Sequence, residues 1–184
     1  TSDGSWGEPI VLSHAGEDVI AAYDTDLVVA GSHLIVTWAQ RERDGWAILA
    51  RRVDAATGAL GEIERLASGA GLHAHPTIAA AGERVLGAGE MAAGSGRGEY
   101  MIQRAGLNDA GRPLGDPTTL RATSDRDCAW PALASDGKRF ALAWDRDEGD
   151  AGHNVFVSLG GPNGRRPDEP IAVSHHPARN FAPS

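Results

Sequence analysis

The sequence predicts an all-β fold built from repeated four-stranded units, and three observations carry that prediction. An apolar run, a short turn signal and a second apolar run recur every fifty residues or so, marked by turn glycines at Gly31, Gly82 and Gly137. The 24 glycines and 10 prolines suit many short strands joined by tight turns. No segment shows a helical hydrophobic period with caps. A strand-built repeat of this size is typical of propeller blades or a similar array.

Each repeat contains four candidate strands in a fixed order. The first two strands flank the turn glycine, and the third is an alternating or apolar run that ends in a turn signal. The fourth follows a glycine and an acidic residue. The third-strand segments are 46–55, 99–109 and 154–163, and the fourth-strand segments are 4–13, 58–68, 111–120 and 164–174. Four short antiparallel strands per repeat make a propeller blade.

The strand order divides the chain into an outer strand and three blades. Residues 1–17 carry the outer strand of a preceding blade, and the blades span 18–75, 76–130 and 131–184. Three blades do not close a ring, because propellers usually have four to eight. We therefore expect a β-propeller segment of three four-stranded blades plus one extra N-terminal outer strand, part of a larger ring. We expect a second polypeptide, separated by cleavage in an exposed glycine-rich connection, to complete the ring. The alternative is that two copies of this chain pair as half-rings.

These repeats resemble a known group of proteins. The pattern of 131–144, the segment 48–61 with Arg51, Arg52 and Asp54, and the fourth-strand motif at 8–13 are similar to the tandem β-propeller repeats of large secreted bacterial proteins, including myxobacterial ones. The resemblance covers nearly the whole chain and implies a secreted, periplasmic or cell-surface protein. The Asp-box signature of sialidase propellers is absent, and residues 2–6 match it only in part.

Charge and composition limit the kinds of ligand and surface that the protein is expected to bind. The formal net charge is −8 and the isoelectric point is near 5.3, which disfavours binding to nucleic-acid phosphates or an anionic membrane surface. Cationic ligands, metal ions and neutral sugars are compatible with this charge. No apolar run approaches the length of a membrane span, so no membrane insertion is expected. The one cysteine, Cys128, forms no internal disulfide, and we expect it to be buried.

One face of the predicted blades gathers most of the histidines. The connections between blades and between second and third strands share this face, and we expect them to be the longer loops that carry sites. His73, His75, His175 and His176 lie there, and are candidate ligands of a divalent metal ion, either calcium or a transition metal. Ordinary solvated loop residues are the alternative. Residues 145–150 loosely resemble a calcium loop or form a solvated tip.

Aromatic and acidic residues on the same face suggest a ligand site. Trp130 directly precedes a first strand, at the position that His75 and Asp24 hold in the other blades, where residues crowd the mouth of a central channel. Trp130 and Trp46 can stack on a sugar ring, with Asp127 and Asp24 as neighbouring carboxylates. Trp38 and Trp144 are expected to pack between blades.

Catalytic signals are weak. Glu90 is a candidate acid or base, because it replaces Trp38 and Trp144 in the middle blade and would lie near the ring centre. It can equally pair with Arg97 or Arg104. The sequence therefore predicts a ligand- or partner-binding propeller. The alternative is an enzyme, glycoside-processing or metal-dependent, with its active site on the long-loop face, and a third possibility is a purely structural module.

Overall fold

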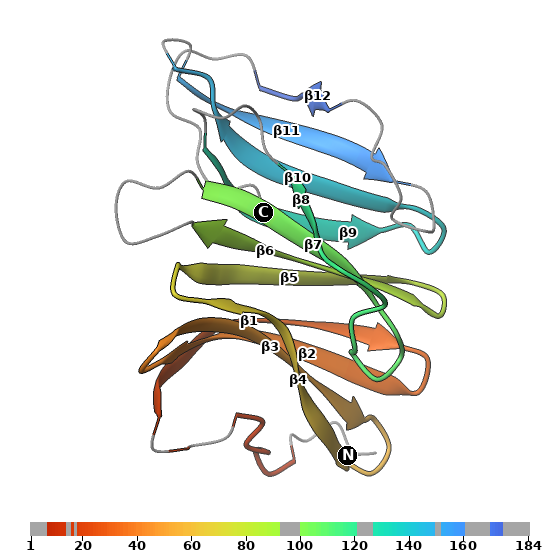
Figure 1. Cartoon of the computed structure of the whole chain (residues 1–184). Helices are drawn as coiled ribbons and strands as arrows, with labels where there is room; N and C mark the ends of the chain where they lie inside the picture. Colours follow the sequence, from red (N-terminus) through yellow and green to blue (C-terminus); the bar gives the residue numbers. More distant parts are fainter. Residues whose placement is uncertain are drawn as a thin grey trace.

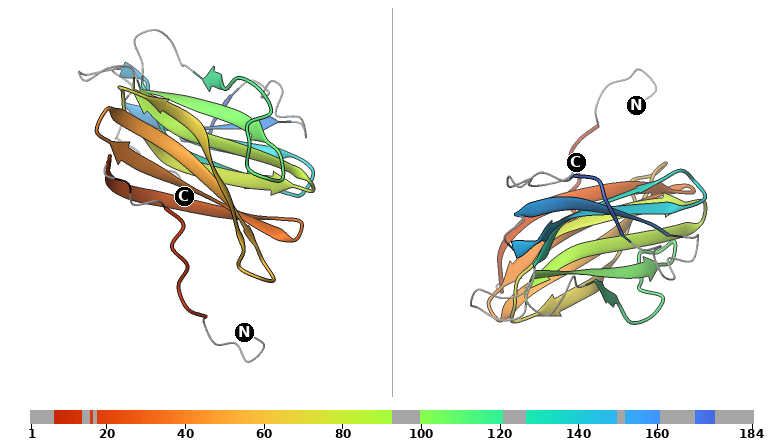
Figure 2. Two further views of the ribbon diagram at one scale, coloured as in Figure 1. Left: turned by 60° about the horizontal axis from the view of Figure 1, so that its bottom comes forward. Right: turned by 90° about the horizontal axis from the view of Figure 1, so that it is seen from above.

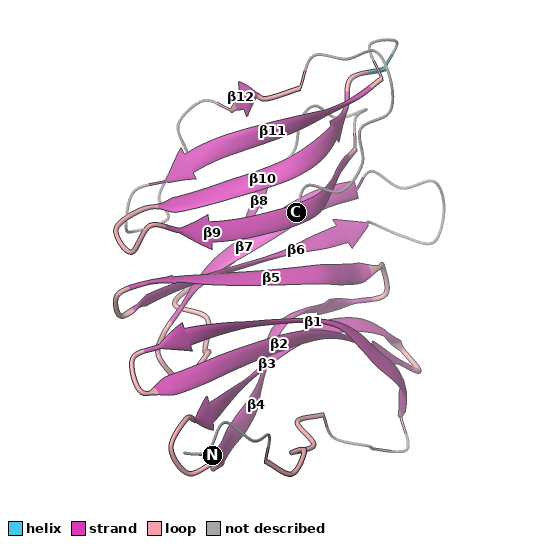
Figure 3. Cartoon of the chain, turned by 180° about the vertical axis from the view of Figure 1, so that it is seen from behind, coloured by secondary structure: helices cyan, strands magenta, loops and turns pink. Residues whose placement is uncertain are grey.

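The computed structural model describes residues 7–13, 16, 18–92, 100–120, 127–149, 152–160 and 170–174. These residues form three four-stranded antiparallel sheets, so the predicted all-β propeller segment is confirmed. The sheets lie one above another, each twisted relative to the next (Figure 1). In the described part of the chain the elements are strands joined by loops, apart from a short piece of 3₁₀ helix at Gly149, cyan in Figure 3.

Each sheet is a meander in which neighbouring strands follow one another along the chain. The first contains β1 (Val19–Ala30), β2 (His33–Glu42), β3 (Gly45–Asp54) and β4 (Leu60–Gly69). The second contains β5 (His73–Ala81), β6 (Arg84–Ala92), β7 (Tyr100–Leu107) and β8 (Thr118–Leu120). The third contains β9 (Cys128–Ser135), β10 (Phe140–Asp147), β11 (His153–Gly160) and β12 (Ile171–Ala172). We call these sheets blades 1, 2 and 3.

Tight turns set the register of the first hairpin in blades 1 and 2. Gly31 and Gly82 adopt φ values of +62° and +64°, which L-residues with a Cβ avoid. Each allows the chain to reverse within two residues, after Ala30 and Ala81. In blade 3 Gly137 also has a positive φ, +84°, and the turn is further held by Asp136, whose carboxylate accepts the N–H groups of Lys138 and Arg139.

The first strands of the blades lie side by side, and β5 contacts both β1 and β9 (Figures 1 and 2). Apolar side chains fill the spaces between blades. Between blades 1 and 2 the core includes Ile35, Ile78, Val85 and Leu107. Between blades 2 and 3 it includes Ile102, Trp144 and Phe156. Cys128 belongs to this second cluster and is fully buried, as expected.

Hydrogen bonds also join the blades. Asp26 Oδ2 accepts the Ile78 N–H at 2.9 Å and the Thr77 hydroxyl at 3.1 Å. The oxygen of that hydroxyl in turn accepts the Leu133 N–H at 3.0 Å. A side chain of one first strand thus meets the backbone of the next, and the chain of bonds crosses all three blades.

Two connections at blade 1 are shorter than expected, whereas residues 93–99 separate β6 from β7 and residues 121–127 separate β8 from β9. The link between β4 and β5 is only residues 70–72, and the β2–β3 hairpin turns at residues 43–44. The first strands begin earlier than predicted, because His73 and its neighbours join the sheet instead of forming a loop. The N-terminal segment 7–13 pairs with no strand among the described residues, and its role as an outer strand of another blade stays a prediction.

Candidate functional site

A bulge interrupts every first strand. The register shifts between Tyr23 and Thr25 in β1, between Ala74 and Thr77 in β5, and opposite Ala143–Asp145 in β9. The residues at these bulges are Asp24, His75 and Trp130, with φ values of +51°, +47° and +53°. No other described residue besides glycine has a positive φ. Left-handed backbone at a non-glycine residue is costly and tends to mark functional positions.

The three bulge residues come from different blades and meet. His75 Nδ1 lies 3.2 Å from Asp24 Oδ2, with the two side chains 26% and 34% exposed. The His75 and Trp130 rings lie 3.9 Å apart, centre to centre, and are tilted by 31°. Trp130 as a whole is 41% exposed. We call Asp24, His75, Trp130 and Glu90, described next, the bulge cluster.

Glu90 connects the cluster to the buried part of blade 2. It is 4% exposed, and its Oε2 accepts the Trp130 N–H at 3.0 Å. Burial raises the pKa of Glu90 above its ordinary value, while the Trp130 N–H and then His75 lower it, and Asp127 and Asp24 raise it further. A buried carboxyl of this kind holds its proton at higher pH than an exposed one.

The strand register corrects the predicted place of Glu90 in the repeat. Glu90 pairs with Ala74, as Ala39 pairs with Tyr23 and Asp145 with Ala129. Glu90 therefore matches Ala39 and Asp145, and it is Gly89 that stands where Trp38 and Trp144 stand. Counting seven residues from each turn glycine would have shown this from the sequence. Glu90 accepts the Trp130 N–H, and the alternative pairing with Arg104 is not formed. Arg97, the other alternative partner, lies outside the described residues.

Two further predicted ligand residues lie beside the cluster. Asp127 Oδ1 accepts the Tyr100 N–H at 2.7 Å, and its charge raises the pKa of Glu90. Trp46 packs edge-to-face on Tyr23, the neighbour of Asp24, with ring centres 5.6 Å apart. Asp127 is thus close to the cluster, whereas Trp46, in β3, contacts Tyr23 next to it.

The histidines do not assemble as a metal site within the described residues. His73 is in β5 and only 4% exposed, and burial lowers its pKa. His75 instead pairs with Asp24. No group of three or more His, Cys, Asp or Glu in the described part of the chain is placed to hold a metal ion. His175 and His176 lie outside the described residues.

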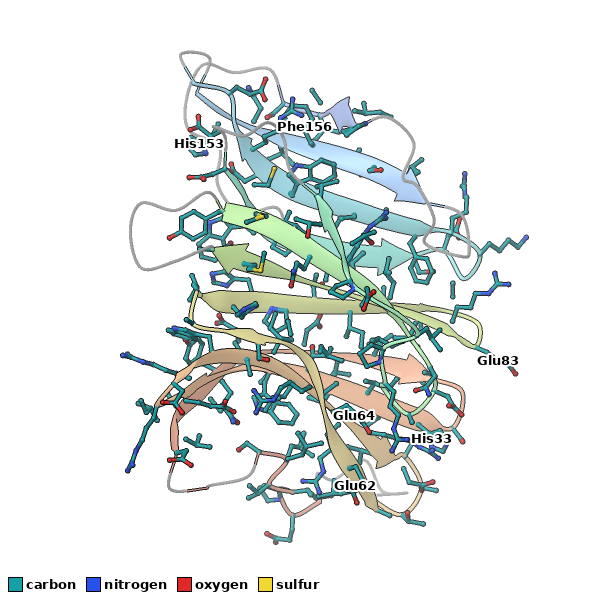
Figure 4. The ribbon with its side chains drawn as sticks, in the orientation of Figure 1. His33, Glu62, Glu64, Glu83, His153 and Phe156 are labelled. Atoms are coloured by element: carbon teal, nitrogen blue, oxygen red, sulfur yellow. The ribbon has the colours of Figure 1, made fainter. Side chains whose placement is uncertain are left out.

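A second acid–histidine pair lies on the same side of the sheets. Asp145 is 2% exposed, and its Oδ1 lies 2.8 Å from His153 Nδ1. Figure 4 shows His153 at the edge opposite His33 and Glu83, as the strand order predicted. Asp145 is therefore a buried strand residue and not part of a solvated tip. Burial raises its pKa, and the hydrogen bond and charge of His153 oppose that rise.

The bulge cluster offers a set of groups suited to polar, ring-shaped ligands. Trp130 gives an exposed aromatic surface, Asp24 and the neighbouring Asp127 give carboxylates, and His75 gives an imidazole. Aromatic faces stack on the apolar faces of sugar rings, while carboxylates accept hydroxyl hydrogen bonds. Glu90 adds a buried carboxyl whose pKa is raised, and the protonated form of such a carboxyl can donate a proton.

Comparison with solved structures places the fold among β-propellers. The chain is similar to an α-L-arabinofuranosidase from Lactobacillus brevis, with 12% identity, a TM-score of 0.58, and coverage of 94% of this chain and 62% of that one. It is also similar to the catalytic domain of a family-62 α-L-arabinofuranosidase from Coprinopsis cinerea, with 13% identity, a TM-score of 0.51, and coverage of 95% and 58%. A thermostable family-43 glycoside hydrolase matches with 10% identity, a TM-score of 0.54, and coverage of 83% and 54%.

These similarities concern the fold, and the chain spans about 54–62% of the length of these three structures. No protein-family model matches the sequence, and no curated protein matches it either. No helix in the described residues is long and apolar enough to span a membrane.

Proposed function

We propose that the chain forms part of a β-propeller that binds a saccharide at the bulge cluster. The observation that carries this proposal is the meeting of Asp24, His75 and Trp130, one from each blade, with left-handed backbone at all three. The fold similarity to glycoside hydrolases adds support at the level of architecture.

The test is calorimetric titration of the protein with short arabino-oligosaccharides. We expect saturable binding that is clearly weakened in Trp130→Ala and largely kept in Trp130→Phe, because phenylalanine retains a stacking face. A lost stacking contact of about 1–1.5 kcal/mol corresponds to roughly tenfold weaker binding. The proposal fails if no neutral saccharide binds, or if Trp130→Ala binds as tightly as the wild type.

A second candidate function is hydrolysis of a glycosidic bond, with Glu90 as the acid. The observation that favours it is the buried Glu90 carboxyl, whose raised pKa suits proton donation to a leaving oxygen. Asp24, an exposed carboxylate of the same cluster, is the candidate base that would activate the attacking water. Release of nitrophenol from 4-nitrophenyl α-L-arabinofuranoside tests this, and Glu90→Gln should abolish it while saccharide binding remains.

We further propose that additional blades, supplied by a second polypeptide, complete the ring. Ile78 in β5 is 4% exposed because it packs against blade 1, yet the equivalent Leu27 in β1 is 58% exposed. Val29 and Ile20 on β1 are exposed as well. This flank has the character of a surface that a preceding blade would cover.

The native mass decides how the ring is made. A complex with a different chain supports this proposal, whereas a dimer of this chain alone would favour paired half-rings. A particle of only 19.2 kDa would contradict both. A secreted or cell-surface location and a myxobacterial type of origin stay predictions.

A further inference from the structure

The bulge cluster carries an excess of negative charge. Burial and then the Trp130 N–H act most strongly on the pKa of Glu90. The charges that shift this pKa further are those of His75, Asp127 and Asp24, and no lysine or arginine of the described chain is among them. The His75 imidazole already has a carboxylate partner, since its Nδ1 lies 3.2 Å from Asp24 Oδ2. A cationic ligand would therefore meet excess negative charge here, whereas an anionic ligand would lack a counter-charge.

Arg41 does not neutralise this charge. It is exposed, and its guanidinium lies over the Trp46 ring, 5.7 Å from the ring centre. Burial and then Asp24 raise the pKa of Tyr23, and Arg41 lowers it, so the charge of Arg41 reaches the neighbour of Asp24. It is not among the charges that shift the pKa of Glu90. Because water and salt screen an exposed guanidinium, the field at the cluster stays negative.

Glu90 has one carboxyl oxygen that is still open to a ligand. Its Oε2 accepts the Trp130 N–H at 3.0 Å, and its Oε1 makes no hydrogen bond with any described residue. Glu90 is nevertheless only 4% exposed, so water satisfies this oxygen poorly. A buried acceptor without a donor is costly, and an N–H donor of a bound ligand would offset that cost.

Trp130 adds an aromatic surface to this negative field. It is 41% exposed, and the His75 ring lies 3.9 Å from its ring, centre to centre. The faces of an indole attract a cation through the ring quadrupole, and they also stack on the apolar face of a sugar. The same side chain can thus contact both the cationic group and the ring of a charged saccharide.

A bare metal ion fits the cluster less well than an ammonium group. Within the described residues no group of three or more His, Cys, Asp or Glu is placed to hold a metal ion. An ammonium group needs no such fixed coordination shell, and it offers three N–H donors that separate acceptors can share. The formal net charge of −8 also favours the approach of a cation.

We propose that the ligand of the bulge cluster is an amino sugar, that is, a saccharide with a primary ammonium group. This inference rests on the proposed saccharide site and names its ligand class. The ammonium group pairs with Asp24 and donates to Glu90 Oε1, and Asp127 strengthens the negative field around it. The sugar ring lies against the exposed part of Trp130.

Calorimetric titration with the β-1,4-linked dimer of glucosamine tests this inference, and its N,N′-diacetyl form is the neutral comparator with the same skeleton. At about pH 6.5 the amino groups carry most of their protons. We expect the dimer to bind at least about tenfold more tightly than the diacetyl form, because it adds charge-assisted hydrogen bonds. This preference should shrink in about 0.5 M NaCl. A disaccharide of galacturonate, which is anionic, should not bind.

Amide variants locate the charge effect. Asp24→Asn should reduce the preference for the glucosamine dimer to about threefold or less, and Asp127→Asn should reduce it by a smaller factor. Both variants keep an acceptor oxygen. Trp130→Ala should weaken both dimers, because both lose the stacking surface. Glu83→Gln, at an exposed acid on the edge opposite His153 (Figure 4), is the matched control and should change either affinity by less than about twofold.

The outcomes separate this inference from the proposed function. No binding of the glucosamine dimer up to about 10 mM, equal affinity for the two dimers, or a preference unchanged in both Asp24→Asn and Asp127→Asn would overturn the inference. If arabino-oligosaccharides bind at Trp130 in any of these cases, the proposed saccharide site stands and only its ligand class is wrong. If no saccharide binds at all, the proposed function itself fails.

Discussion

Replacing Asp26 should uncouple blade 1 from blade 2. In Asp26→Ala the Ile78 N–H and the Thr77 hydroxyl both lose their acceptor, and Ile78 is only 4% exposed. Hydrogen bonds to a charged group contribute about 1.5–3 kcal/mol each, and the partial exposure of Asp26 places both near the lower end. We therefore expect the free energy of unfolding to fall by about 2–4 kcal/mol, or roughly 5–15 °C in Tm.

Urea unfolding followed by tryptophan fluorescence measures this change, with the m-value checked for two-state behaviour. Asp26→Asn keeps an acceptor oxygen and should cost about 1 kcal/mol or less. Asp44→Ala, at an exposed residue of the β2–β3 hairpin, is the control and should change stability by less than about 0.5 kcal/mol.

A double-mutant cycle with Thr77→Val tests whether the bonds act together. The Thr77 hydroxyl links Asp26 to the Leu133 N–H, so the two substitutions should couple by about 1 kcal/mol. A loss below about 0.5 kcal/mol in Asp26→Ala would refute the reasoning, because it would mean that water replaces the inter-blade bonds at no cost.

Two other predictions follow from single residues. The raised pKa of Glu90 means that the folded protein binds this proton more tightly than the unfolded chain, so stability falls as pH rises through the folded pKa. Glu90→Gln should flatten this dependence in urea unfolding between pH 4 and 8. A free energy of unfolding that rises with pH in the wild type relative to the variant would contradict this prediction. Gly82→Ala should cost about 1 kcal/mol by thermal unfolding from backbone strain alone, since φ is +64° and no atom lies within 4 Å of the new Cβ, whereas Gly82→Asn should cost less.

The strand order was predictable because its signals are local. A turn glycine such as Gly31, which adopts a positive φ, marks the turn, and the apolar runs on both sides of it indicate the hairpin. The three-sheet meander follows from repeating this pattern. The structure confirms that architecture and adds the register.

The bulge cluster was predictable only in part. The equivalence of Asp24, His75 and Trp130 was visible from their positions before the first strands, but the left-handed backbone that brings them together was not. A bulge adds one unpaired residue, and sequence patterns with a period of two do not show where it falls. The same one-residue ambiguity explains why Glu90 was matched to Trp38 and Trp144 instead of Ala39 and Asp145.

The predicted metal ligands show a different limit. Histidines near the start of a first strand look alike in sequence, whether they are buried, as His73 is, or paired with a carboxylate, as His75 is. Burial and partner choice depend on contacts between blades, which are distant along the chain.

The central claim is that the bulge cluster binds a saccharide, and the indole N–H signals of the protein test it most directly. The chain has five tryptophans, whose signals can be assigned by single Trp→Phe substitutions in a ¹H–¹⁵N spectrum. On titration with an arabino-oligosaccharide, the Trp130 signal should shift most, and those of the buried Trp38 and Trp144 should stay in place. A saturating titration that moves other indole signals and leaves Trp130 unchanged would contradict the account.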